Sequence, residues 1–285
     1  MTVEEPIRLG RVMTEEGHYR LVQFVGLSAA GDDRANAQVQ PVLGDMFGDL
    51  QPFGEALPLS TVRLLPPVVP GKIVAVASNF RDHAAEMGRD LPEEPRLFLK
   101  PNTAVIGDGE SIRIPLDVGR VDYEAELGVV IGRTLIDATP EEAMEGVLGY
   151  TCVNDVTARA LQKKDGVFGR AKGFDTFCPL GPWIVTGLDP SNLRIRTWVG
   201  EELRQDGSTA SMVFDVPTLI SFISKVMTLV PGDVISTGTP AGVGPLTANA
   251  TVKIQIEGIG QLTNDVVPRA SQAAADEASA LGDST

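Results

Sequence analysis

The sequence predicts a β-rich α+β fold, because short apolar runs outnumber the segments with a helical pattern. Runs such as 19–25 and 72–77 have the length of strands, whereas only three or four segments show the apolar spacing of a helix. No internal repeat is visible. With 285 residues, the chain can form one large domain and a smaller one.

Changes in composition divide the chain into three parts. Residues 1–66 are predicted to form a small β-rich domain with no chemically suggestive residues. The stiff linker Leu64–Gly71 (L-L-P-P-V-V-P-G) marks the boundary, and the main domain covers residues 67–268. The tail 269–285 is rich in Ala, Ser and Asp, and we expect it to be disordered.

Charge and residue usage exclude several classes of function. Lys+Arg 24 against Asp+Glu 38 gives a net charge of −14, which disfavours nucleic acids and anionic membranes as partners. No apolar run approaches the ~18 residues of a membrane span, and no signal-peptide pattern is present. Cys152 and Cys178 are expected to be reduced packing residues, as in a cytoplasmic protein. His18 and His83 are the only histidines, so any metal must be held mainly by oxygen.

The stretch Val121–Ile131 (V-D-Y-E-A-E-L-G-V-V-I) is predicted to be one strand that is buried on both faces at its end. Side chains alternate along a strand, so Glu124 and Glu126 point to the same side. Two buried carboxylates repel each other and are costly to desolvate, and a divalent cation is the simplest partner for them. An amphipathic strand with its glutamates in water has the same pattern.

A short helix follows the buried strand at 72–77, with Asn79 as its cap and Gly88 at its end. On it, His83 and Glu86 are three residues apart, within hydrogen-bonding reach. A carboxylate that holds one imidazole nitrogen leaves the other free to act as a base. A histidine beside a glutamate on the protein surface, without any catalytic role, has the same spacing. So short a helix is marginal without docking, which suits a mobile lid.

Further along the chain, several charged residues have ordinary structural explanations. Lys100 follows the strand-like run 97–99 and is expected to be solvated at the strand end. A strand ends at Asn154, and a helix that carries Arg159 and Gln162 follows it, so Asp155 is either the helix cap or a ligand. Lys172, in a loop, either faces water or reaches a site.

The remaining elements are two helices and a glycine-rich loop. A capping box at 139–142 starts a helix that runs to about Leu148, and an amphipathic helix lies within 214–230. The loop Thr237–Pro245 (T-G-T-P-A-G-V-G-P) can aim backbone N–H groups and the Thr239 hydroxyl at a carboxylate. Glycines that serve only tight turns have the same pattern.

Six blocks, in this order, resemble the fumarylacetoacetate hydrolase family over roughly residues 70 to 265. They are N-F-R-D-H-A-A-E-M (79–87), L-F-L-K-P (97–101), Y-E-A-E-L (123–127), N-D-V-T-A-R (154–159), K-G-F-D-T (172–176) and T-G-T-P-A-G-V-G-P (237–245). The resemblance implies a mixed β-sandwich roll for the main domain. One departure is Ala77-Ser78-Asn79-Phe80, where many relatives carry Gly-x-Asn-Tyr.

The resemblance also implies roles for individual residues. Glu124, Glu126 and Asp155 match the family's ligands for Mg²⁺ or Mn²⁺, which are hard cations that prefer oxygen. His83 and Glu86 match its catalytic dyad. The other matches are the family's lysine at Lys172, the loop threonine at Thr239 and a substrate-contacting glutamine at Gln162. Because the substrate is anionic, local cations are needed as well, and Arg81 and Arg159 are candidates beside Lys172.

The function that this resemblance implies is metal-dependent hydrolysis of a C–C bond in an acylpyruvate or another 2,4-dioxo acid, through a metal-bound pyruvate enolate. Decarboxylation of oxaloacetate, and isomerisation or decarboxylation of unsaturated 2-oxo dicarboxylates in aromatic catabolism, are alternatives on the same site. A non-catalytic binding protein with this fold is the alternative of a different class. The resemblance further implies a small 2-oxo acid as the ligand and a homodimer as the assembly.

Overall fold

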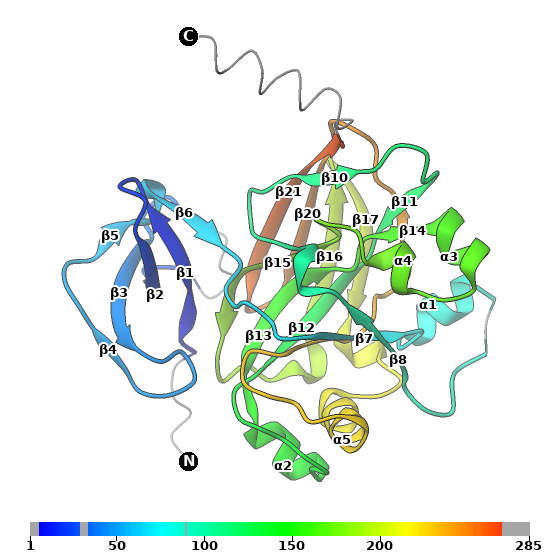
Figure 1. Ribbon diagram of the computed structural model, residues 1–285, viewed down its shortest axis with the longest axis horizontal. Helices are drawn as coiled ribbons and strands as arrows, with labels where there is room; N and C mark the ends of the chain where they lie inside the picture. Colours follow the sequence, from blue (N-terminus) through cyan, green and yellow to red (C-terminus); the bar gives the residue numbers. More distant parts are fainter. Residues whose placement is uncertain (1–5, 29–33, 89, 270–285) are drawn as a thin grey trace.

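The computed structural model describes residues 6–28, 34–88 and 90–269, which form a sheet-rich fold with short helices (Figure 1). The predicted tail begins at Arg269, and its residues 270–285 lie outside the described residues. Among the helices of the described residues, none has the length and apolar character needed to cross a bilayer.

The first strands of the chain gather at one side of the larger body, drawn in blue in Figure 1. They are β1 (Arg8–Thr14), β2 (Tyr19–Val25), β3 (Gln38–Gly44), β4 (Leu50–Pro52), β5 (Leu57–Pro58) and β6 (Val62–Leu65). The remaining strands are β7 (Ile73–Ala77), β8 (Arg96–Lys100), β9 (Val105–Ile106), β10 (Ile112–Ile114), β11 (Val121–Tyr123), β12 (Ala125–Ile131), β13 (Val147–Asn154), β14 (Thr157–Ala158), β15 (Cys178–Val185), β16 (Arg194–Val199), β17 (Glu202–Ser208), β18 (Val234–Ser236), β19 (Gly244–Pro245), β20 (Thr251–Ile256) and β21 (Gly260–Pro268).

One long sheet connects the N-terminal strands to the rest of the molecule. Its order is β4-β3-β2-β1-β15-β13-β12-β18-β7-β8. The junction is the antiparallel pairing of β1 with β15, where Arg8 lies opposite Val185 and Leu9 opposite Ile184. The N-terminal unit therefore adds strands to the main sheet, although the sequence indicates a linker between the two parts. A second sheet, β10-β21-β20-β16-β17, packs beside it.

Strand β12 lies in the middle of the long sheet, and all of its residues are buried. Leu127 and Val129 belong to one apolar cluster, and Val130 belongs to another. Because successive side chains point to opposite faces, apolar side chains cover both faces of this strand. The prediction of a strand buried on both sides is confirmed here, and it means that the glutamates at its start enter a dry environment.

The predicted single strand Val121–Ile131 is wrong in one respect, since it is interrupted at Glu124. Strand β11 pairs with β14 and β19 in a small third sheet, whereas β12 belongs to the long sheet. At the interruption, the backbone N–H of Glu124 donates to the side-chain oxygen of Asn154 at 3.0 Å. The chain thus changes sheets at a residue that was predicted to bind metal.

The α-helices of the described residues are α1 (Arg81–Glu86), α2 (Pro140–Glu145), α3 (Arg159–Asp165), α4 (Gly169–Lys172) and α5 (Val216–Val226). The capping box at the start of α2 is confirmed, but the helix ends at Glu145 rather than near Leu148, because Val147 already pairs in β13. The amphipathic helix α5 is confirmed, with its apolar residues packed into the main core.

Asn79 does not cap the short helix α1, contrary to the prediction. The helix begins after Phe80, without a side-chain cap. The Asn79 side chain is buried and joins three backbone groups: it donates to the carbonyls of Phe214 and Thr237 at 3.0 and 2.8 Å, and it accepts from the N–H of Phe214 at 2.9 Å. Asn79 therefore docks the start of α1 onto two distant segments of the chain.

Candidate active site

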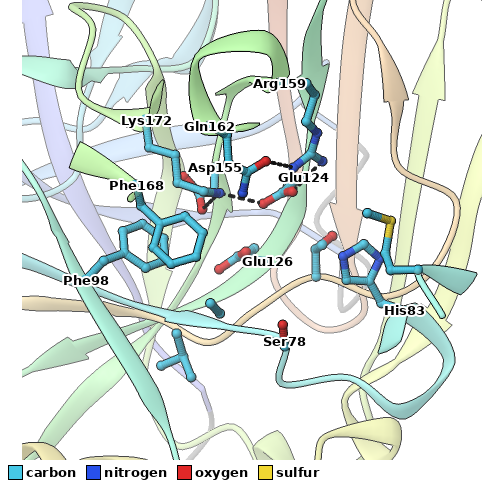
Figure 2. A pocket seen from close by; sticks show the side chains of 14 residues that line it. Ser78, His83, Phe98, Glu124, Glu126, Asp155, Arg159, Gln162, Phe168 and Lys172 are labelled. Atoms are coloured by element: carbon cyan, nitrogen blue, oxygen red, sulfur yellow. Dashed lines mark hydrogen bonds and ion pairs between the residues drawn. The ribbon is translucent and has the colours of Figure 1, made fainter. Parts of the chain in front are cut away.

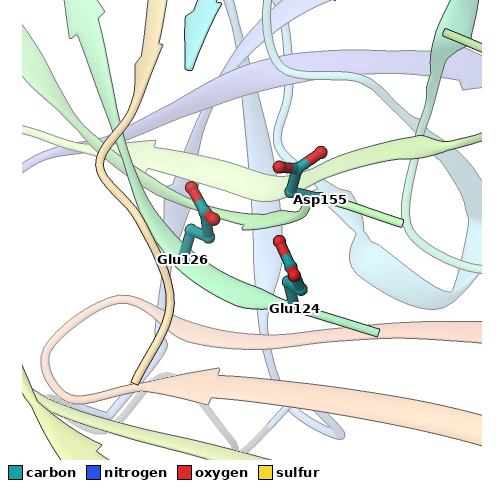
Figure 3. A group of neighbouring side chains, drawn as sticks. All are labelled: Glu124, Glu126 and Asp155. Carbon is teal, nitrogen blue, oxygen red and sulfur yellow. The ribbon is translucent and has the colours of Figure 1, made fainter. Parts of the chain in front are cut away.

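Three carboxylates meet where the start of β12 lies beside the end of β13. In the antiparallel register Ala125 lies opposite Asn154, so Glu124 and Glu126 come close to Asp155. One oxygen from each carboxylate lies within 4.8 Å of the others, and Figure 3 shows the three side chains converging. Their exposed fractions are only 5, 2 and 1%. The three residues that were predicted to bind metal are thus brought together in a buried cluster.

Two buried lysines neutralise part of this cluster. The Lys172 ammonium donates to Glu124 Oε2 and Thr157 Oγ1, both at 2.8 Å, and also forms an ion pair with Asp155. Lys100 donates to the other oxygen of Asp155 at 2.7 Å and to the backbone carbonyl of Lys172 at 2.6 Å. Burial disfavours the charged ammonium of Lys172, but Asp155 and Glu124 outweigh this effect and raise its pKa. Lys172 therefore carries a positive charge.

Arg159, on α3, links Glu124 to a fourth carboxylate. It donates to Glu124 Oε1 at 2.5 Å and to Asp122 Oδ2 at 2.7 Å. Burial raises the pKa of Glu124, but the charges of Lys172 and Arg159 outweigh burial and lower this pKa to about 2. Glu124 is therefore an anion that two cations orient.

Glu126 differs from its two neighbours, because no Lys or Arg of the described residues forms an ion pair with it. Its carboxylate accepts from Ser236 Oγ at 2.5 Å and from the N–H of Gly238 at 2.8 Å. Burial, together with the charges of Asp155 and Glu124, raises its pKa to about 8. Glu126 is thus a buried carboxylate without a paired cation, and it lies beside two other carboxylates. A hard divalent cation bound by all three would supply the positive charge that Glu126 lacks.

The predicted dyad of His83 and Glu86 is present on α1 and faces the carboxylates. His83 Nδ1 lies 3.1 Å from Glu86 Oε2, and Glu86 in turn accepts from the N–H of Gly242 at 3.1 Å. In Figure 2 the imidazole lies on the opposite side of the cavity from Lys172. With Nδ1–H donating to Glu86, Nε2 is left as the proton acceptor of the ring.

One cavity is lined by the triad, by His83 and by several apolar side chains. Phe98 and Phe168 pack together with their ring centroids 4.8 Å apart, and both line it. Ser78 also lines it and has a φ of 59°, in the left-handed region where a non-glycine residue is strained. Strain of this kind is common at functional sites.

The three residues that were predicted to contact substrate have different positions. Gln162 lines the cavity and accepts from Arg159 at 3.1 Å. Thr239 also lines it, and its hydroxyl oxygen accepts from Gln205 at 2.9 Å. Arg81 instead donates to the carbonyl of Met212 and is not among the residues that line the cavity. The structure therefore gives no support to Arg81 as a substrate contact.

Some residues at the site were missed or misjudged from the sequence. Lys100 was expected to be solvated, but it is 2% exposed, because Asp155 and the carbonyl of Lys172 lie at the end of its strand. Asn154 and Gln205, whose side chains accept from the backbone N–H groups of Glu124 and Ala125, were not singled out as site residues. Asp155 does not cap α3, whose first flanking residue is Ala158. The one available signal for Lys100 was its place in the L-F-L-K-P block.

Comparison with protein families agrees with this geometry. Residues 72–267 match the family described as fumarylacetoacetate (FAA) hydrolase C-terminal, and residues 5–67 match the Rv2993c-like N-terminal family. The chain belongs to the fumarylacetoacetate hydrolase family. Its architecture, a curled sheet with an added N-terminal unit, is the fold of that family, as the resemblance implied.

Three related proteins indicate the range of chemistry on this fold. The structure of the 2-hydroxyhepta-2,4-diene-1,7-dioate isomerase of Mycobacterium marinum is 43% identical and covers 93% of this chain and 100% of its own, with a TM-score of 0.86. Oxaloacetate tautomerase YisK of Bacillus subtilis is 43% identical over 223 residues, 73% of this chain and 74% of that protein. Maleylpyruvate hydrolase of Sphingobium, solved with manganese(II) and pyruvate, is 31% identical over 92% of this chain and 100% of its own, with a TM-score of 0.74. Members of this family are therefore enzymes, and they catalyse more than one reaction.

Proposed function

We propose that this protein is a divalent-metal-dependent hydrolase that cleaves a C–C bond of an acylpyruvate or another 2,4-dioxo acid. The observation that carries this proposal is that His83, which Glu86 contacts through Nδ1, lines the same cavity as the carboxylate triad. A base that can accept a proton from water thus faces the residues that would hold the metal.

The triad of Glu124, Glu126 and Asp155 would hold Mg²⁺ or Mn²⁺. Three carboxylate ligands leave coordination positions for water and for a chelating 2-oxo acid. When bound, the ion supplies Lewis-acid stabilisation of the negative charge that develops on the 2-oxo oxygen. The related maleylpyruvate hydrolase, solved with manganese(II) and pyruvate, supports this choice, because pyruvate is the expected product of acylpyruvate cleavage.

Other side chains bind and orient the substrate. Lys172 keeps a positive charge in the cavity and offsets the negative charge that the substrate adds. Gln162 and Thr239 present polar atoms to the same space, and Phe98 and Phe168 keep water away from one side of it. A dry surrounding strengthens each of these electrostatic interactions.

His83 performs the proton transfers of the hydrolysis. Glu86 orients the ring through Nδ1, so Nε2 accepts a proton from a water molecule. The hydroxide adds to the distal carbonyl carbon of the substrate. The bond from that carbon to C3 then breaks, its electron pair goes to C3, and the proton is returned there. The products are one carboxylic acid and pyruvate, which accounts for every atom of the substrate and the water.

A second candidate is a proton shift without hydrolysis, such as tautomerisation of oxaloacetate or isomerisation of an unsaturated 2-oxo dicarboxylate. The observation in its favour is the 43% identity to both the tautomerase and the isomerase. These reactions need the metal, Lys172 and one base, but they need no water as a nucleophile. Oxaloacetate decarboxylation likewise needs no water as a nucleophile, since CO2 leaves and C3 takes up a proton, and pyruvate release from oxaloacetate reports it in the same assay.

The deciding experiment measures products from acetylpyruvate, fumarylpyruvate and oxaloacetate with Mn²⁺ or Mg²⁺, with and without EDTA. Pyruvate release from an acylpyruvate that EDTA abolishes is the expected result, and Glu124→Ala should abolish it as well. Interconversion of the oxaloacetate tautomers, without cleavage of either acylpyruvate, would favour the second candidate. Turnover that persists in EDTA or in Glu124→Ala would contradict the metal assignment.

A further inference from the structure

Gln205, on β17, is a buried polar residue next to the site that has no role in the proposed reaction. Its exposed fraction is 0%. Its Oε1 accepts from the N–H of Ala125 at 3.2 Å and from Thr197 Oγ1 at 2.8 Å. Its Nε2 donates to Thr239 Oγ1 and to the carbonyl of Pro240, both at 2.9 Å. The amide thus uses all four of its hydrogen-bonding positions.

The orientation of this amide is determined by its backbone partners. The Ala125 N–H can only donate, and the Pro240 carbonyl can only accept. A flipped amide would place N–H against N–H and oxygen against oxygen, leaving buried groups unpaired. The amino group of Gln205 must therefore face the loop that carries Thr239.

This orientation determines what the Thr239 hydroxyl can do. A hydroxyl has one hydrogen and two lone pairs, and the Gln205 N–H occupies a lone pair. Within the described residues, no protein group accepts the Thr239 hydrogen, while the residue lines the cavity. The hydrogen is then available to an acceptor in the cavity, and the hydroxyl acts there as a donor.

We propose that Gln205 is a positioning residue that makes Thr239 a hydrogen-bond donor to an anionic oxygen of the bound 2-oxo acid. The donors run in one direction, from Thr197 to Gln205 to Thr239 and then into the cavity, and such chains strengthen each member. The identity of the substrate rests on the proposed function, but the direction of the hydrogen bonds rests on the structure alone.

The same side chain fixes the distance between the donor and the metal ligands. Ala125, which Gln205 contacts, lies between Glu124 and Glu126. The loop fits closely onto β17, since a Cβ at Gly207 would lie 2.5 Å from Pro240, and one at Gly242 would lie 2.3 Å from the carbonyl of Arg204. Strand β17 thus packs against the loop that carries Thr239 and holds this loop at a fixed distance from the carboxylates.

The test is a double-mutant cycle on ligand binding, with oxalate as the probe. Oxalate has the planar shape and paired anionic oxygens of an enolised 2-oxo acid. Its binding to the Mn²⁺-loaded protein is measured by calorimetry for wild type, Thr239→Val, Gln205→Met and the double variant. Thr239→Val keeps the shape of the side chain and removes the hydroxyl, and Thr239→Ser is its matched control.

We expect Thr239→Val to weaken oxalate binding about tenfold and Thr239→Ser to change it by no more than about twofold, because only the former loses the donor. Gln205→Met should weaken binding in the wild-type background but add nothing to Thr239→Val, since it acts through the hydroxyl. Mn²⁺ affinity, which a merely structural defect would also lower, should stay within about twofold in Thr239→Val.

Independent effects of the two substitutions, or unchanged oxalate binding in Thr239→Val, would overturn the proposal. If Gln205→Met does not fold, Gln205→Glu replaces it in the cycle, because a carboxyl group keeps both acceptor contacts. Its long-range charge acts in both Thr239 backgrounds and so cancels from the coupling, whereas its effect on the Thr239 hydroxyl remains in the coupling. Failure of the proposed function would appear differently, as absent pyruvate release together with an intact oxalate cycle.

Discussion

At the scale of single residues, Lys100 and Glu126 show that the surroundings of a charged side chain depend on how the chain folds around it. Lys100 is a lysine at a strand end, a position where lysines are usually solvated, yet it lies against Asp155. Glu126 is one of three similar carboxylates, but it is the one with which no Lys or Arg of the described residues forms an ion pair. Both properties depend on neighbours that are distant in sequence.

The catalytic base can be tested with a matched control, because the chain has only two histidines. His83→Gln should lower kcat for acylpyruvate hydrolysis by about 100-fold or more, since the imidazole that accepts the proton of the water is lost. His18→Gln, on the exposed turn between β1 and β2, should leave kcat unchanged. Steady-state kinetics with Mn²⁺ decide the matter, and equal losses in the two variants would refute the role of His83.

Glu126→Gln should separate metal binding from folding. The neutral amide oxygen can still accept from Ser236 and Gly238, so the metal-free variant should be at least as stable as the wild type. Mn²⁺ should raise the melting temperature of the wild type but not of Glu126→Gln, because binding to the folded state is lost. Glu141→Gln, on the surface of α2, serves as the control. An undiminished Mn²⁺ shift in Glu126→Gln would contradict the ligand assignment.

At the scale of elements, helix α1 is held in place by contacts at both of its ends. Asn79 joins its start to Phe214 and Thr237, and Glu86 joins its end to Gly242. A six-residue helix has little stability of its own, so these contacts decide where His83 lies. In this structure the predicted lid is docked over the site.

Thr139 and Asn79 both lie beside the start of a helix, but only Thr139 is a cap, and the two should respond differently to alanine. Thr139→Ala removes the capping box of α2, away from the cavity, and should lower the free energy of unfolding by about 1 kcal/mol without changing kcat. Asn79→Ala leaves buried backbone groups unpaired and should cost about 2–3 kcal/mol. It should also lower kcat, because α1 loses its anchor. Denaturant unfolding and kinetics on both variants test this, and an unchanged kcat in Asn79→Ala would show that α1 is positioned without it.

At the scale of the whole molecule, the core protects both cysteines, as expected from the sequence. Burial raises the pKa of Cys178 to about 12 and also raises that of Cys152. Because the thiolate is the reactive form, neither thiol should react with Ellman's reagent in the native protein at pH 8. Two thiols per chain should react after unfolding in guanidinium. Rapid reaction of a native thiol would mean that the core opens locally.

The homodimer that the family resemblance implies stays a prediction.

The sequence by itself determined the β-rich character, a buried strand within 121–131, the capping box of α2 and the dyad spacing on α1. These features depend on the alternation of side chains along a strand, on the spacing of residues along a helix and on contacts between residues within about four positions. The family resemblance, which rests on six ordered blocks, added the metal ligands. The cluster of Glu124, Glu126 and Asp155 then follows from the register of β12 and β13.

Only the tertiary structure decided which polar residues are buried and what they contact. Lys100 meets Asp155 across 55 residues of sequence, Gln205 meets Ala125 across 80, and Asn79 meets Thr237 across 158. The break at Glu124 likewise depends on Asn154, 30 residues further along the chain. No local pattern encodes such contacts, because the strands that make them are brought together only when the sheets form.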